Sequence, residues 1–151
     1  EDDDPTNGSE RMPALEARNW GIGNGLFFGG DALLSGDHGF FNNQLGFWAL
    51  GASLKNISFL DKLSHSFTAF YAKGTNDEAL ATYSPDSDFA LTDKDSIWEF
   101  TLNNSYKLYD ELTFMVNFSY DVNDYDKDTW GADVNKRDDA MKLSTGLLYS
   151  F

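Results

Sequence analysis

The feature that most constrains this chain is a two-residue alternation through its last eleven residues, from Met141 to Phe151. The odd positions from Met141 onward are Met, Leu, Thr, Leu, Tyr and Phe, whereas the even positions are Lys, Ser, Gly, Leu and Ser. One set is apolar and ends in aromatic residues, and the other is mostly small and polar. Because successive side chains of a β-strand point to opposite faces of a sheet, this period predicts a strand with one apolar face.

The same alternation recurs earlier in the chain. It is clear in the segment from Leu112 to Asp121 and least regular near Phe47, which interrupts the polar positions of its segment. No apolar run approaches the ~18–20 residues that a membrane helix needs. The prediction is an all-β, antiparallel fold with five strands, at residues 44–54, 63–74, 95–106, 112–121 and 140–151.

The segments between these strands alternate in length. Residues 55–62 and 107–111 make short connections, whereas residues 75–93 and 122–139 are long and rich in Asp, Asn, Gly and Ser. Short turns at one end and long loops at the other are typical of outer-membrane barrels. The pattern therefore predicts an antiparallel transmembrane β-barrel, with a soluble β-sandwich as the alternative because it alternates in the same way.

Aromatic residues favour the barrel, since they gather near both ends of the apolar positions and a membrane barrel carries an aromatic girdle at each interface. The predicted girdle residues are Trp48, Tyr71, Trp98, Tyr106, Phe114, Tyr120 and Tyr149. The polar positions of the same strands would face a wet lumen. The predicted lumen-facing residues are Glu99, Asn103, Asn117, Asp121 and Lys142. Charged rings set ion selectivity in pores, and the excess of acid over base here predicts a mild preference for cations.

Composition excludes several other functions. A net charge of −14 argues against nucleic-acid binding, because little in the chain would neutralise phosphates. The absence of cysteine excludes disulfides, thiolate metal sites and a cysteine nucleophile. Neither His38, in a loop-like stretch beside Asp37, nor His65, on the outward face, has a convincing catalytic partner, and no serine sits in a Gly-x-Ser-x-Gly elbow. We predict no enzyme activity, no catalytic residue and no cofactor.

The acidic stretch after Asp121 is not a calcium-binding EF-hand. Counted from Asp124, Thr129 stands where that loop needs glycine, and Asn135 stands where it needs a bidentate glutamate. No defined metal site is predicted. Weak binding of Ca²⁺ or Mg²⁺ at the acidic loops, bridging lipopolysaccharide phosphates, is left open by the charge alone.

Residues 1–43 are Gly-rich in part and show no stable period. We expect a long extracellular loop region there, with a hidden hairpin as the alternative, followed by barrel strands over residues 44–151. Five strands are fewer than the ~8 of the smallest bacterial barrels, and odd in number, so they cannot close. The chain is therefore expected to be the C-terminal part of a larger barrel.

The end of the chain carries a resemblance to a known class. A terminal Phe151 with Tyr149 two positions before it, and Leu147 and Leu143 at alternate positions further back, resembles the C-terminal signature of Gram-negative outer-membrane β-barrels. The resemblance covers residues 44–151. In its overall pattern of strands and loops the chain resembles homotrimeric porins of sulfate-reducing bacteria and alginate-export-type barrels.

This resemblance implies a location in the outer membrane of a Gram-negative bacterium. It implies that Leu147, Tyr149 and Phe151 form a signal read by the barrel-assembly machinery, and that the partners are outer-membrane lipid, lipopolysaccharide and two further copies in a homotrimer. The function it implies is a porin for passive diffusion of small hydrophilic solutes. The alternatives are a plugged structural or adhesive barrel and a soluble carbohydrate-binding β-sandwich.

Overall fold

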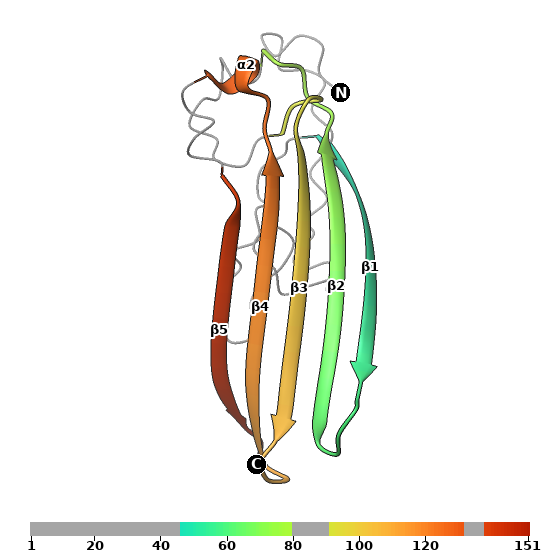
Figure 1. The fold of residues 1–151 in the computed structure, drawn as a ribbon, viewed down its shortest axis with the longest axis vertical. Coiled ribbons are helices and arrows are strands. Elements are labelled where there is room, and N and C mark those ends of the chain that lie inside the picture. Colours follow the sequence, from blue (N-terminus) through green and yellow to red (C-terminus); the bar gives the residue numbers. More distant parts are fainter. Residues whose placement is uncertain (1–45, 80–90, 132–137) are drawn as a thin grey trace.

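The computed structural model describes residues 46–79, 91–131 and 138–151, which form a single antiparallel sheet. Its strands follow one another in sequence order, each paired with the next (Figure 1). The elements are β1 (Phe47–Ile57), β2 (Leu63–Gly74), β3 (Ser96–Lys107), β4 (Leu112–Asp124), the short helix α2 (Lys127–Trp130) and β5 (Ala140–Tyr149). The prediction of an all-β fold with five antiparallel strands is confirmed. The sheet is open, since β1 and β5 are its two edges and do not pair with each other.

Strand bounds differ from the predicted ones at several ends. Strand β1 continues to Ile57 rather than 54, because a bulge between Leu54 and Ile57 absorbs Asn56. Asn56 has a φ of 58°, in the left-handed region that asparagine tolerates. Strand β1 begins at Phe47; the predicted start at 44, like the whole predicted loop region 1–43, lies outside the described residues.

Four other ends need correction. Strand β3 starts at Ser96 instead of 95, because Asp95 belongs to the preceding loop, and it ends at Lys107 instead of 106. Strand β4 extends three residues past the predicted 121, to Asp124. Strand β5 stops at Tyr149 instead of 151, where the Ser150 N–H donates instead to the Glu111 carbonyl in the β3–β4 turn, at 2.8 Å.

The two kinds of connection lie at opposite ends of the sheet. The β1–β2 and β3–β4 turns lie at the lower end in Figure 1, beside the C-terminus, and α2 lies at the upper end. The α2 helix, inside the predicted acidic loop 122–139, was not predicted from the sequence. Among the described residues, no helix has both the length and the apolar character needed to cross a membrane.

The strand register places the apolar positions of all five strands on one side of the sheet. This apolar face runs in cross-strand rows, for example Leu54, Phe67, Leu102, Phe118 and Leu143 across all five strands. Its side chains are exposed: Leu50 is 71% exposed and Leu143 is 67% exposed. A sheet of a water-soluble domain packs this face against a core. Here the large apolar surface is left uncovered, which marks an interaction surface.

The opposite side, the polar face, is the buried one over the middle of the sheet. It is defined by residues Ser53, Thr68, Glu99, Thr101, Asn103, Asn117, Ser119, Asp121, Lys142 and Ser144. Apolar burial is confined largely to the loop end, where Leu91, Ile97 and Trp130 are buried. The sheet is therefore amphipathic, but its apolar face is exposed and much of its polar face is buried.

Candidate functional site

The five residues predicted to face a lumen lie together on the polar face of β3, β4 and β5. Register pairs Glu99 with Asp121, and Asn103 with Asn117 four residues further along. Lys142 of β5 is opposite Ser119, which places it diagonal to Asp121. The structure thus brings a carboxylate pair, a lysine and an amide pair into three successive rows.

The two carboxylates at the loop end of this group are withdrawn from solvent. Glu99 is 0% exposed and Asp121 is 4% exposed. Directly opposed residues of antiparallel strands have β-carbons about 4.5–5.5 Å apart. Two carboxylates held this close, away from water, are costly unless cations or hydrogen-bond donors reach them. Their placement is therefore the least ordinary feature of the sheet.

A row of hydroxyl groups runs across the sheet between the carboxylate pair and the amide pair. The Ser53 and Thr68 hydroxyls lie 2.8 Å apart, and those of Thr101 and Ser119 lie 3.4 Å apart. Register continues this row to Lys142 on β5. Sequence reasoning missed these hydroxyls, although counting two positions from Glu99 or Asp121 would have placed Thr101 and Ser119 on the same face.

Several buried oxygen atoms of the polar face lack a hydrogen-bond partner within the part of the chain that the structure describes. They are Asp121 Oδ1, Asn103 Oδ1 and Ser144 Oγ. Carboxylate and amide oxygens accept hydrogen bonds or coordinate cations, and do not donate. The surface is accordingly suited to a cationic or hydrogen-bond-donating ligand.

No family model, curated protein or solved structure matches this chain. Its function is therefore inferred from geometry and from the sequence patterns described above.

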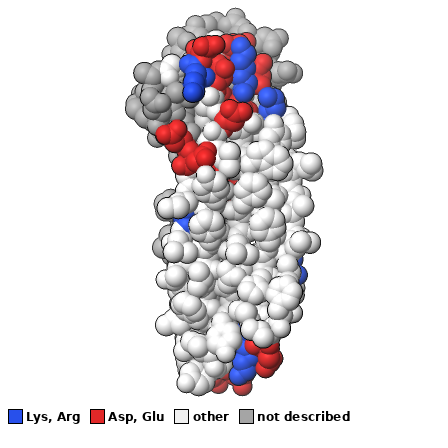
Figure 2. Space-filling model, in the orientation of Figure 1, with Lys and Arg blue, Asp and Glu red and all other residues white. Residues whose placement is uncertain are grey.

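The predicted girdle residues all lie on the apolar face, most of them in two groups. At the loop end, Tyr71 packs between Trp48 and Trp98, with ring centroids 5.4 Å and 4.9 Å apart. At the turn end, Tyr106 pairs with Phe114. The exceptions are Tyr149, one row nearer the turns, and Tyr120, which lies between the groups with its hydroxyl bonded to Asp139, outside the strand, at 2.8 Å. Figure 2 shows most charged side chains at the two ends of the molecule and a broad uncharged surface between them, with basic side chains only at its left and right margins.

One polar pair interrupts the apolar face. His65 Nδ1 lies 2.6 Å from Asn104 Oδ1, and the Asn104 amide donates to the Val116 carbonyl at 3.1 Å. Both side chains are half-buried, and Phe59 lies beside the imidazole. These contacts account for His65 as a structural residue, and no acidic partner that would suit catalysis contacts it within the described part of the chain.

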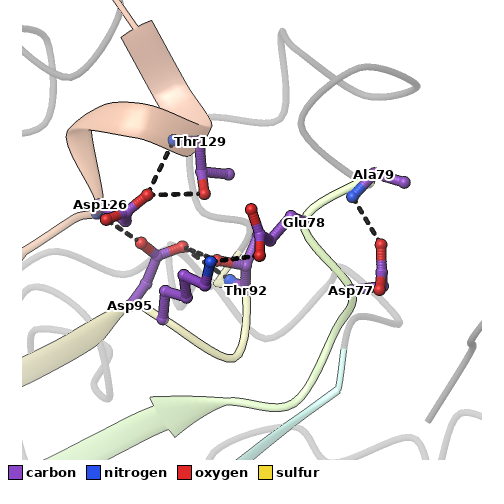
Figure 3. A network of polar contacts seen from close by, with 8 residues as sticks. Asp77, Glu78, Ala79, Thr92, Asp95, Asp126 and Thr129 are labelled. Carbon is purple, nitrogen blue, oxygen red and sulfur yellow. Dashed lines mark hydrogen bonds and ion pairs between the residues drawn. The ribbon is translucent and has the colours of Figure 1, made fainter.

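The loop end is organised around Asp95, a residue that sequence reasoning did not single out. Its carboxylate is fully buried and accepts four hydrogen bonds. Figure 3 shows those from Thr92 and Asp126. One oxygen accepts from the Thr92 amide and hydroxyl, both at 2.7 Å, and from the Trp130 indole at 2.8 Å. The other accepts from the Asp126 amide at 2.8 Å. Asp95 thus joins the β2–β3 connection to the segment that holds α2.

We call Asp95 and the residues that it holds together at this end of the sheet (Thr92, Asp126 and Trp130) the loop platform. Other charged side chains in and beside the loop platform are also paired. Asp126 caps α2 by accepting from the Thr129 hydroxyl and amide, and these bonds lower the pKa of the Asp126 carboxyl. An ion pair between Lys94 and Glu78 raises the pKa of the Lys94 ammonium. Among the described residues no group of three or more His, Asp or Glu side chains is arranged to hold a metal ion.

Proposed function

We propose that this chain contributes strands to a transmembrane β-barrel of a Gram-negative outer membrane, and that the barrel conducts small hydrophilic solutes by passive diffusion. The observation that carries the proposal is the inverted amphipathicity of the sheet. A membrane barrel presents apolar side chains to lipid and polar side chains to its interior. The exposed apolar face and the polar face of this sheet match that arrangement.

The dimensions of the apolar face support the proposal. Trp98 and Tyr106 belong to its two aromatic groups and stand eight residues apart on β3. At ~3.3 Å per residue and a tilt of ~40°, eight residues cover about 20 Å along the membrane normal. The apolar band of an outer-membrane barrel is ~25 Å tall. On this face, no described residue between the two aromatic groups carries a charge.

The two open edges specify what else the barrel needs. Strands β1 and β5 run in the same direction, because they are the first and last of five consecutive antiparallel strands. Lipid does not tolerate unpaired backbone groups, so both edges require a neighbour that runs in the direction of β2 and β4. An odd number of further strands meets this requirement and makes the total even. The proposal is thus a larger barrel, with this sheet as its C-terminal part.

Other parts of the proposal follow from the C-terminal signature. Leu147 and Tyr149 are more than half exposed on the apolar face, and Phe151 is fully exposed. These side chains are accessible to the barrel-assembly machinery, as the proposed signal requires. Association with lipopolysaccharide and assembly as a homotrimer are proposed from the resemblance to porins.

A second candidate is a structural or adhesive barrel whose interior is occupied. It is favoured by one observation: Glu99, Thr101 and Ser119 on the polar face are almost completely buried, so bulk water does not reach them. The soluble β-sandwich has less support, because a sandwich requires a second sheet against the apolar face, and that face is exposed.

Conductance in planar lipid bilayers separates these candidates. The protein, folded in detergent and added to a bilayer in 1 M KCl, is expected to give discrete ohmic steps. A protein that folds into lipid vesicles and gives no steps would support the occupied barrel. A protein that stays monomeric and soluble without detergent would overturn the membrane proposal altogether.

A further inference from the structure

The connection between β2 and β3 returns to the sheet across the end of β2. Gly74, the last residue of β2, lies an even number of positions after Thr68, so both belong to the polar side of the strand. A β-carbon added at Gly74 would overlap the carbonyl groups of Leu91 and Thr92. Glycine in a strand often marks such a close approach of another backbone. The main chain of Leu91 and Thr92 therefore lies against Gly74 on the polar side of the sheet.

Residues 91–95, which we call the return segment, are held in this place by hydrogen bonds. The Gly74 amide donates to the Asp95 carbonyl at 3.2 Å, and the Asn76 side-chain amide donates to the Leu91 carbonyl at 2.6 Å. Leu91 is also almost completely buried. The return segment is thus fixed to the end of β2 at both of its own ends.

Asn76 further joins the return segment to the beginning of β1. Its Oδ1 atom accepts from the Gly46 amide at 3.0 Å, and its Nδ2 atom donates to the Gly46 carbonyl at 2.8 Å. A neighbouring strand would make this same pair of bonds. On the other side of the return segment, Asp95 binds the Asp126 amide and the Trp130 indole. One series of hydrogen bonds therefore runs from the start of β1 to α2, with the return segment in its middle.

The polar side of the sheet changes character next to the return segment. Ala72 and Ile97 lie opposite each other in the row before Gly74, and both are buried. They are apolar, whereas the rows further from the loop end carry carboxylates, hydroxyls and amides. Segments that open easily have few buried apolar contacts. The buried apolar residues at this end therefore suit a segment that stays in place.

We propose that the return segment is folded inward at the mouth of the proposed barrel and limits the size of the solutes that enter. The inference rests on the proposed channel function and names the element that restricts it. The interior of a membrane barrel is the polar side of its sheet, so a segment held on that side narrows the opening. The diameter of a pore is one of the properties that decide which solutes pass.

The test measures the size of the neutral polymers that the pore of the full protein admits. A polyethylene glycol that enters a pore lowers its single-channel conductance, and one that is excluded does not, so a series of polymers gives the exclusion limit. Asn76→Ala removes the bonds to Gly46 and Leu91. Asp95→Asn replaces one acceptor oxygen with a donor, so part of the loop platform loses its acceptor. Both variants are expected to admit a larger polymer than wild type does.

Two neighbouring residues supply matched controls. Asp77→Ala truncates a side chain that accepts from the Ala79 amide within the same turn, and Asp93→Asn removes a charge from an exposed side chain of the return segment. Both are expected to keep the wild-type exclusion limit. Folding of each variant is checked by the heat-dependent mobility of barrels on gels. Release of the return segment is checked by faster hydrogen exchange of the backbone amides of residues 91–95.

The outcomes separate the two proposals. Faster exchange in residues 91–95 with an unchanged exclusion limit would overturn the size-limiting role and leave the channel intact. Exchange that stays at the wild-type rate in both Asn76→Ala and Asp95→Asn would overturn it as well, because the return segment would then not be held by these bonds. Absence of conductance from the folded wild-type protein would overturn both proposals.

Discussion

Gly51 of β1 lies directly opposite Phe70 of β2, and a β-carbon added at Gly51 would stand 2.0 Å from the Phe70 ring. Phe70 is buried and shares the polar face with the carboxylate pair, since register places it opposite Glu99. The glycine thus makes room for an aromatic ring at the first edge strand of the sheet. The need for glycine at position 51 therefore comes from the space that the Phe70 ring occupies.

This relationship predicts that Gly51→Ala is destabilising. The added methyl group must displace a buried ring, and overpacking of this kind costs about 1–3 kcal/mol. The free energy of unfolding in urea, measured with the protein in lipid vesicles, checks the value. Gly51→Ala combined with Phe70→Leu is the control, because the smaller side chain gives the methyl group space. If the double variant is no more stable than Gly51→Ala alone, the ring is not the cause.

The loop platform predicts a larger effect at Asp95. In Asp95→Ala, four donors lose their acceptor, among them the Trp130 indole and the Asp126 amide. Each donor left unsatisfied costs about 1–3 kcal/mol where it is buried. We expect α2 and the β2–β3 connection to become sensitive to proteases at concentrations that leave wild type intact. Asp93→Asn is the control, since Asp93 is exposed two residues away; equal sensitivity of the two variants would contradict the assignment.

Asp126 predicts a pH dependence at the same end of the sheet. The Thr129 hydroxyl and amide lower the pKa of the Asp126 carboxyl in the folded protein. A lowered pKa means that this cap stabilises α2 fully above the unfolded pKa of aspartate, about 3.9, and that the effect is lost as the pH falls through the folded pKa. We expect the fluorescence of the buried Trp130 to change in acid over that range.

Two variants isolate that titration. Thr129→Val removes the side-chain donor and is expected to narrow the pH range over which the cap weakens. Asp126→Asn keeps a capping side chain that does not ionise, so its Trp130 signal is expected to stay constant over the same range. An acid transition that persists unchanged in Asp126→Asn would assign it to another group.

The sequence predicted the sheet well because a two-residue period is a local property. Strand β2 was predicted with its observed bounds, and parity alone placed Glu99, Asn103, Asn117, Asp121 and Lys142 on one face. Strand ends were less accurate, because they depend on partners far along the chain. Strand β5 stops where Ser150 bonds to Glu111, and nothing in the alternation from Met141 to Phe151 signals that contact.

The loop platform was beyond sequence reasoning for a related reason. Asp95 was predicted as the first residue of a strand, and its role depends on Trp130 and Asp126, more than thirty residues away. The burial of the carboxylate pair was equally hidden. Alternation tells which face Glu99 and Asp121 occupy, but the degree to which water reaches that face depends on the assembled structure.

The apolar face gives the sharpest test of the membrane proposal. Leu143 lies in the middle row of that face and Val122 in a row near the loop end, and both are exposed. In a barrel, an arginine facing lipid costs about 2–4 kcal/mol at the bilayer midplane and about 0–1 kcal/mol near the interface. We therefore expect Leu143→Arg to lower the free energy of folding into lipid vesicles strongly and Val122→Arg to lower it little. In a soluble protein an exposed leucine is replaced by arginine at almost no cost. Equal, small effects of the two variants would thus place this face in water, and a steep difference between them would place it in lipid.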